Sequence, residues 1–522
     1  TMANLPAPTL RTLITTKYLD WAEKLPRFQR GWIANLQVHR EYEREQAEKL
    51  HQRTRPPEKA EVQYLYIRMF DIFNIEDFEN LYKGLLALFS ETEKDFAHRN
   101  PLSDYKEFSE GISRGGWKRI GIIRPEGPSK FKLFSTRMLA GLPAEVDVIY
   151  INLHKILPSI LMVSMDVILK HDATDHLKRL QERFYLPQTQ LSRIVPWRLW
   201  GWQEYPPELV MNAAIQGWQD SLRSRIELTL QPFLNGYFMQ RTARPLPRLP
   251  AIEVYGLQGI PEELENFDKW KSQASDWLRS QGLVVDYDIY GNERVLFRLH
   301  KNGAPHWISP HFLIVLWEPY LRLTNRQGFG NDPRAVIEHY TEYTLNSITS
   351  GSFMLFYLES LQNEIEKLRS EAFNRIESPL SRFRLLNNHR FYNSIQKNSM
   401  LLDRLKMEFE ERENWIKGEM DEVKDLKEVS SLKSGEGKDL RETILSFVKW
   451  RLDVLGKHLA HVEKSFSGYL RMENIEATYR LQRTMLWLTL VAALVTALGV
   501  MGEWDNIRDV LMQLFNSIWK KL

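Results

Sequence analysis

Residues 484–502 read TMLWLTLVAALVTALGVMG, a run of nineteen residues without a charge that lies between Arg483 and Glu503. An α-helix of that length covers about 28 Å, close to the thickness of a bilayer's hydrocarbon core. Arg480 and Arg483 precede the run, and Trp487 and Trp504 lie near its ends, as is typical of membrane-spanning helices. The run predicts one transmembrane helix, and the alternative is a buried core helix.

One face of this predicted helix carries small side chains. They recur at helical spacing and are Thr489, Ala493, Thr496, Ala497 and Val500. Small residues let helices approach closely in lipid, where packing drives association. The face therefore predicts self-association, with Thr489 and Thr496 as the polar groups available to line a pore.

The end of the chain has a different pattern. Residues 504–522 read WDNIRDVLMQLFNSIWKKL, with apolar residues three or one apart and charges on the opposite side. This pattern predicts an amphipathic C-terminal helix over 503–522 that lies in the membrane surface. The alternative is a helix that packs back on the protein.

Long helices are predicted before the apolar run. Helical periodicity extends from Pro333 to Glu428 with a break at Pro379, and a flexible loop, SSLKSGEG, occupies 430–437. Two apolar seams indicate coiled-coil-like packing of an antiparallel hairpin. Their residues are Ile395, Leu402, Phe409, Ile416 and Val423 before the loop, and Leu445, Val448, Leu452, Leu455, Leu459, Val462, Phe466 and Tyr469 after it. The second helix is expected to begin near Lys438, so that a helical stalk over 331–483 runs directly into the transmembrane helix.

The first 330 residues mix predicted strands and helices. Strand patterns cover 62–67, 117–123, 146–151, 160–169, 284–289, 294–299 and 312–317, and helical patterns cover 75–90, 173–184, 207–239 and 262–279. The order does not alternate regularly, which favours an α+β fold. A turn at 290–293 predicts a hairpin, and the proline-rich RTARPLPRLP at 241–250 predicts a linker between an N-terminal domain, 1–245, and a small subdomain, 246–330. The predicted fold class is an α+β cytosolic region followed by a coiled-coil-like stalk and one transmembrane helix.

Composition restricts the chemistry and the location. The 522 residues include no cysteine, which excludes disulfides, thiolate catalysis and cysteine-based metal sites. Seventy basic and 67 acidic residues give a net charge of +3, too balanced for extensive nucleic-acid binding. The first residues resemble no secretory signal. We expect a single-pass protein of the cell inner membrane with its large N-terminal region in the cytoplasm.

Familiar catalytic signatures are missing from the sequence. It contains no GxxxxGK, HExxH or GxGxxG, which disfavours an enzyme of those classes, and no cofactor is expected. The stretch HDATDH at 171–176 has two interpretations: a divalent-metal site, or a helix start capped by Asp172 or Thr174. His300, His306 and His311 are a second, weaker metal candidate.

A basic passage with two glycines is the best candidate for a soluble ligand. Residues 113–132 read SRGGWKRIGIIRPEGPSKFK. Glycine lets backbone amides approach an anion, and arginine binds phosphate in a bidentate manner. The passage predicts a nucleotide or phosphate-bearing ligand at Arg114, Gly115, Gly116, Lys118 and Arg119. The alternative is an exposed, charged hairpin flank.

The order of these parts resembles the CorA-type divalent-cation channels. The resemblance is one of layout over about residues 330–502, where a stalk helix continues into a membrane helix. The family has a Gly-Met-Asn motif after its first span, where this chain has GVMGEW at 499–504, and it has a second span, where this chain has its amphipathic tail. A stalk and pore without that motif also resembles membrane effectors of bacterial antiviral defence.

The resemblance implies a homo-oligomeric membrane effector or channel gated by a ligand, such as a nucleotide, on its cytosolic domain. A rival hypothesis from the same sequence is a scaffold tethered by one span that binds a protein partner without transporting anything. A third is a membrane-bound enzyme that uses the 171–176 cluster.

Overall fold

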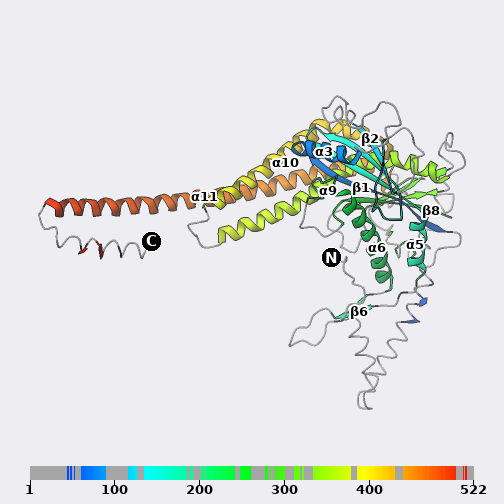
Figure 1. Cartoon of the computed structure of the whole chain (residues 1–522), viewed down its shortest axis with the longest axis horizontal. Coiled ribbons are helices and arrows are strands. Elements are labelled where there is room, and N and C mark those ends of the chain that lie inside the picture. Colours follow the sequence, from blue (N-terminus) through cyan, green and yellow to red (C-terminus); the bar gives the residue numbers. More distant parts are fainter. Residues whose placement is uncertain are drawn as a thin grey trace, which may run out of the picture. The chain divides into compact units, whose positions relative to one another are not determined.

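The structure is a computed structural model of the whole chain (Figure 1). The residues that it describes are chiefly 60–89, 116–125, 135–183, 207–240, 247–259, 289–292, 294–299, 311–317, 333–377, 385–428 and 439–500. Two compact units divide the chain. The sheet unit comprises Thr1–Phe356 and Glu408–Val448, and the helical unit comprises Tyr357–Met407 and Lys449–Leu522.

A ten-stranded mixed sheet forms the core of the sheet unit. In their order across the sheet, the strands are β12 (Lys427–Glu428), β9 (Ile289–Gly291), β10 (Val295–Arg298), β11 (Phe312–Leu316), β8 (Ala251–Gln258), β1 (Glu61–Asn74), β5 (Ile160–Leu169), β4 (Val146–Leu157), β2 (Gly116–Arg124) and β3 (Ser135–Met138). Neighbours are antiparallel except for β11 with β8 and β2 with β3, which are parallel. A separate two-stranded sheet pairs β6 (Gln188–Leu191) with β7 (Trp202–Tyr205).

Both faces of the central strands are covered, since every residue of β5 is buried. The remaining elements of the N-terminal region are η2 (Ile75–Asp77), α3 (Phe78–Phe89), α5 (His171–Glu182) and α6 (Pro207–Leu230). On β1, Phe70 packs edge-on against Phe356 of α9 (Pro333–Glu377), whereas the next residue, Asp71, binds backbone amides that follow α6. Successive strand residues point to opposite faces. Helix α9 therefore covers one face of the sheet, and α6 with its following loop covers the other.

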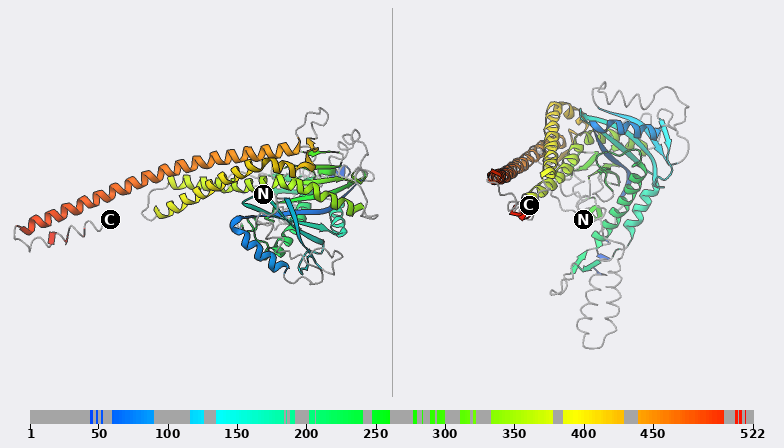
Figure 2. Two further views of the ribbon diagram at one scale, coloured as in Figure 1. Left: turned by 90° about the horizontal axis from the view of Figure 1, so that it is seen from above. Right: turned by 60° about the vertical axis from the view of Figure 1, so that its left-hand side comes forward.

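The helical unit contains parts of three long helices, α9, α10 (Leu385–Glu419) and α11 (Leu440–Val500) (Figure 2). Between α10 and α11, Phe391 packs on Phe466 and Lys406 pairs with Asp453. Residue numbers rise on one helix as they fall on the other, so the two helices run antiparallel, as predicted. The predicted seam of α11 is buried from Leu445 to Phe466.

The last part of α11 is exposed in the single chain. Every residue from Met485 to Leu490 is exposed, although most of them are apolar. Within the residues that the structure describes, no helix is long and apolar enough to cross a membrane. The predicted span of 484–502 extends beyond them: the side chains of 498–500 and all of 501–502 lie outside the described residues, as does most of the predicted surface helix over 503–522.

Most predicted strands are confirmed, several with longer bounds. The strand predicted at 160–169 matches β5, whereas β1 extends seven residues beyond the predicted end at 67 because the run continues through buried Arg68 and Asp71. The hairpin is confirmed with a shifted turn, since Tyr290 and Gly291 belong to β9 and pair with β10. The ten-stranded sheet draws strands from both sides of the predicted linker at 241–250, so the two predicted subdomains share one sheet.

Some predicted helices end at other residues in the structure, and one lies largely outside the described residues. Helix α6 ends at Leu230 and not at Met239, because Pro232 and Gly236 follow and Asp71 binds the amides of Gly236 and Phe238. A Cβ at Gly236 would lie 2.7 Å from the Asp71 carboxyl carbon, so this close approach requires glycine. Val423 lies in a 3₁₀ turn after α10. The helix predicted over 262–279 and the loop over 430–437 fall largely or wholly outside the described residues.

Candidate functional site

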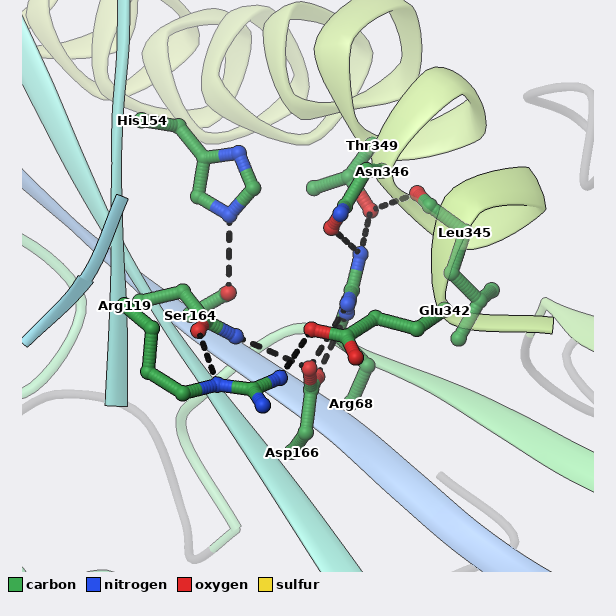
Figure 3. A network of polar contacts seen from close by, with 10 residues as sticks. Arg68, Arg119, His154, Ser164, Asp166, Glu342, Leu345, Asn346 and Thr349 are labelled. Atoms are coloured by element: carbon green, nitrogen blue, oxygen red, sulfur yellow. Dashed lines mark hydrogen bonds and ion pairs between the residues drawn. The ribbon is translucent and has the colours of Figure 1, made fainter. Parts of the chain in front are cut away.

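Polar side chains from four strands and one helix meet inside the sheet unit (Figure 3). We call this set the polar clamp. Its members are Arg68, Arg119, Asn152, Asp166, Glu342, Asn346 and Thr349. They come from β1, β2, β4, β5 and α9, so the clamp joins the centre of the sheet to the first half of α9.

Strand register places the clamp residues at two nearby levels of the sheet. Arg68 of β1 lies opposite Asp166 of β5, and Asn152 of β4 lies opposite Arg119 of β2. Side chains that face each other across neighbouring antiparallel strands have Cβ atoms about 5 Å apart. The pairing therefore follows from the register, and the antiparallel hairpin of β4 and β5 brings the two halves together.

Arg68 makes the strongest contacts of the clamp. Its Nε donates to Asp166 Oδ1 at 2.6 Å and its Nη2 to Asp166 Oδ2 at 2.7 Å, a bidentate pair that is almost completely buried. Its Nη1 donates to Asn346 Oδ1 at 2.7 Å and Thr349 Oγ1 at 3.2 Å on α9. Burial lowers the pKa of Arg68, but the Asp166 carboxylate outweighs burial, so the pKa is raised overall and the guanidinium stays charged.

Arg119 is held from three sides at the edge of the clamp. It pairs with Glu342 of α9, and its Nε donates to Asn152 Oδ1 at 3.2 Å. Its guanidinium also lies over the ring of Tyr150, 4.1 Å from the centroid. The Arg119 and Glu342 side chains are 17% and 16% exposed, so this pair is the part of the clamp that solvent reaches.

The clamp is electrically balanced. Two guanidiniums, Arg68 and Arg119, face two carboxylates, Asp166 and Glu342. The neighbouring imidazole of His154 shares a hydrogen bond of 2.9 Å with Ser164 Oγ. Burial, aided by the positive Arg68, lowers the pKa of His154 well below its usual value, so this ring is neutral at physiological pH. The arrangement holds α9 on the sheet.

The structure places the predicted phosphate-binding residues as follows. Gly116, Lys118 and Arg119 lie on β2, with Gly116 at a φ of 105°, and Arg114 and Gly115 lie outside the described residues. Lys118 and Arg119 point to opposite faces of the sheet because they are neighbours in a strand. Arg119 belongs to the clamp. A phosphate role for these residues stays a prediction.

The 171–176 stretch starts a helix without the predicted cap. Helix α5 begins at His171, and its N-cap is Lys170, which makes no side-chain cap bond. The capping prediction for Asp172 or Thr174 is therefore wrong, because Thr174 is buried and its hydroxyl accepts the Tyr64 amide of β1 at 3.2 Å. His176 stacks on Trp218 of α6.

Metal binding has no support in the described part of the chain, where no group of three or more His, Asp or Glu side chains is placed to hold a metal ion. His311 is buried and stacks on Phe297, and His300 and His306 lie outside the described residues.

A second buried cluster lies on the α6 face. Tyr255 Oη donates to Glu253 Oε2 at 2.5 Å and accepts from Gln219 Nε2 of α6 at 2.7 Å. The ring of Tyr255 stacks on Tyr64, with centroids 5.0 Å apart. Burial raises the pKa of Glu253. This cluster attaches α6 to the sheet as the polar clamp attaches α9.

The helical unit has its own buried polar contact, which we call the helix lock. Asn388 of α10 donates to Glu473 of α11 at 3.2 Å and accepts from Arg375 of α9 at 3.0 Å. Arg375 also lies over the Phe391 ring, 4.5 Å from its centroid. The lock joins all three helices next to the point where the exposed part of α11 begins.

Sequence reasoning missed Arg68, Asp166, Asn346 and Glu473, because single polar residues inside apolar patterns carry no signal of their distant partners. Arg68 and Asp166 are 98 residues apart, and Arg119 and Glu342 are 223 apart. A charged residue in a strand that is otherwise buried was the available signal, since such a charge needs a partner. Comparison with known proteins gives no relative: no protein-family model and no curated protein matches the chain.

Proposed function

We propose that this protein is a membrane effector that inserts the apolar end of α11 into a bilayer, assembles there as a homo-oligomer, and is controlled by a ligand on its sheet unit. In this arrangement the sheet unit lies on the cytoplasmic side. The channel and antiviral-effector layouts that the sequence resembles belong to the same class of mechanism.

One observation carries the proposal: the end of α11 is apolar and exposed on all sides. Met485, Leu486, Trp487 and Leu488 are 60%, 62%, 54% and 59% exposed. Four consecutive residues cover about 300° of a helix surface, because each residue turns the helix by about 100°. A helix that is apolar all round is stable in hydrocarbon or inside a protein core, not in water.

The polar groups in this segment are compatible with lipid. The hydroxyl of Thr489 donates to the carbonyl of Met485, and that of Thr496 to Ala492, each at 2.8 Å. Neither hydroxyl needs water or a second helix, which removes most of the free energy that burying it would cost. The segment therefore presents satisfied polar atoms and an apolar surface to its surroundings.

The length of the segment fits insertion. The described apolar part, 484–497, has fourteen residues and covers about 21 Å as a helix. The sequence continues without a charge to Gly502, for a total of about 28 Å. Arg480 and Arg483 on the preceding turn are placed to meet anionic headgroups.

Ligand control is proposed to act through the polar clamp. The Arg119–Glu342 pair is the partly exposed contact between the sheet and α9. A phosphate-bearing ligand that binds Arg119 would compete with Glu342 and weaken the attachment of α9. A ligand can shift an equilibrium in this way when it binds one of two arrangements more tightly.

A tether without transport is the second candidate function, and the threonine hydroxyls favour it. Because Thr489 and Thr496 donate within their own helix, they offer no free donor toward a pore. In this alternative the end of α11 holds the protein on the membrane, and the sheet unit binds a partner.

Flotation with lipid vesicles tests insertion. We expect the full chain to float with vesicles after a wash in high salt, and the double variant Leu488→Arg, Leu494→Arg to remain in the soluble fraction, since each buried arginine costs about 3 kcal/mol. Met400→Arg is the matched control, because Met400 is a 73% exposed methionine on α10. Flotation of the double variant equal to that of the control would contradict the proposal. Release of an encapsulated dye then separates the two candidates, since a tether leaves the dye inside.

A further inference from the structure

The exposed end of α11 carries a second, more ordered pattern within its apolar surface. Residues recur at alternating spacings of three and four over nine positions: Met472, Ile475, Tyr479, Gln482, Leu486, Thr489, Ala493, Thr496 and Val500. This is the a/d repeat of a coiled coil. We refer to these positions as the α11 stripe.

The stripe begins where packing within the chain ends. The buried seam of α11 continues through Leu470 to Glu473 of the helix lock, and none of the residues from Asn474 to Leu490 is buried. Met472, Ile475 and Tyr479 of the stripe are 71%, 67% and 72% exposed. Three large side chains in heptad positions with this exposure destabilise a helix in water unless a partner covers them.

We propose that the α11 stripe is the contact between copies of this chain, packed in parallel and in register. The parallel direction rests on the proposed function, because chains that insert α11 from the same side of a bilayer have the same orientation. A second observation supports it independently of the membrane. In a parallel coiled coil, the residue just before an a position on one helix lies beside a residue of the partner helix. The number of that partner residue is higher by five.

Those two places hold opposite charges in this chain. With Met472 at position a, they are occupied by Arg471 and Glu476, so each helix pairs its Arg471 with Glu476 of its neighbour. Both residues are exposed in the single chain, where Glu476 also pairs with Arg480 at 2.5 Å. One heptad further along, the equivalent places hold Thr478 and Arg483, which are not opposite charges. Two heptads along they hold Met485 and Leu490, which are apolar and suit a lipid-facing or helix-facing position.

The change in side-chain size along the stripe also fits contact with a second copy of the chain. Before the uncharged segment the stripe has large side chains, such as Met472 and Tyr479, which gain most from leaving water. Inside the segment it has Thr489, Ala493 and Thr496, which permit the close approach that stabilises helices in lipid. A second copy of the chain is thus a suitable occupant along the whole stripe.

Disulfide trapping tests the stripe directly, because the chain has no cysteine of its own. Gln482→Cys places one thiol on the stripe, and Thr484→Cys, two residues away, places one off it. Cysteines bond when their Cα atoms are about 4.4 to 6.8 Å apart. We expect oxidation of the full-length protein in vesicles to give several-fold more covalent dimer for Gln482→Cys than for Thr484→Cys. Ile475→Cys should also give several-fold more dimer than Thr484→Cys.

Equal yields at 482 and 484, or no dimer at 475 and 482, would overturn the proposal, and the flotation assay on the same samples separates this failure from a failure of insertion. Dimer from 482 without flotation supports the stripe and contradicts insertion. Flotation without dimer supports insertion and contradicts the stripe.

A charge exchange tests the register and the direction. In the Gln482→Cys background, Glu476→Arg should lower the dimer yield by roughly twofold to threefold, since exposed ion pairs are weak. Adding Arg471→Glu should restore the yield. Failure of the second change to restore it would show that these residues do not face each other.

Discussion

In the sheet unit, the four charged side chains of the polar clamp are largely buried and paired, whereas ten large apolar side chains between Met472 and Leu494 of the helical unit are exposed. A buried charge needs its partners within the same chain, and the clamp supplies them. For the exposed apolar surface we propose a partner from outside the chain, lipid or another copy. The comparison separates side chains whose partners lie within the same chain from apolar side chains that are exposed in the single chain.

The largest effect should come from breaking the clamp. Asp166→Ala leaves the Arg68 guanidinium buried without its bidentate partner, and we expect the free energy of unfolding to fall by about 3 to 5 kcal/mol. Urea unfolding in detergent, followed by near-ultraviolet circular dichroism, measures it. Asp175 is an exposed aspartate of α5, so Asp175→Ala should change the free energy of unfolding little. Equal losses for the two variants would mean that the clamp does not hold the sheet unit together.

The helix lock tests whether the helical unit also contains a self-sufficient polar contact. Asn388→Ala removes the amide between Arg375 and Glu473, leaving a buried carboxylate without that donor, and should cost about 1 to 3 kcal/mol. Asn398→Ala, a half-buried asparagine of the same helix, is the control. The thermal midpoint of helix unfolding reports the difference. An unchanged midpoint for Asn388→Ala would leave the seam alone to stabilise the three helices.

A pH dependence should distinguish the sheet unit further. Burial raises the pKa of Asp71 to about 7, although four backbone amides that donate to it act in the opposite direction. The folded protein then keeps a proton that the unfolded chain has already lost, so stability falls as pH rises through 7. Between pH 6 and 8 the free energy of unfolding should fall by about 1 kcal/mol. Asp71→Asn should remove this slope. A slope that is the same in wild type and variant would assign it to another group.

The smallest effect should come from an exposed ion pair of the helical unit. Asp453 pairs with Lys406 at 2.5 Å, but both side chains are about half exposed. Water and salt screen such pairs, which contribute little. We expect Asp453→Asn to leave the urea midpoint unchanged within the reproducibility of the titration. A clear drop would mean that surface pairs matter more for this unit than its apolar seam.

The sequence predicted the elements better than their partners. The α11 seam from Leu445 to Phe466 was predictable because apolar residues recur every three or four positions along a single contact surface. Strand β5 was predictable because eight of its ten residues are apolar. The residue-level site was not predictable. The sequence shows the charge of Arg119, on which the phosphate prediction rests, but not its ion pair with Glu342, which the fold brings to it from α9.

Errors at the ends of elements have a similar cause. Asp71 fixes the end of α6 by accepting hydrogen bonds from Gly236 and Phe238, residues more than 160 positions away. Local signals for that end were present in Pro232 and Gly236. The prediction extended the helix to Met239 because apolar residues continue to that position. In the structure these apolar residues pack in the loop after α6 and not in a helix.

The charge balance of the polar clamp also has a consequence for handling the protein. Two positive and two negative side chains, largely shielded from solvent, respond weakly to ionic strength, because mobile ions screen exposed charges far more than buried ones. Concentrated salt, which strips electrostatically adsorbed proteins from membranes, should therefore leave the sheet unit folded. A salt wash can then test whether a bilayer holds the chain, without the ambiguity of a protein that has denatured.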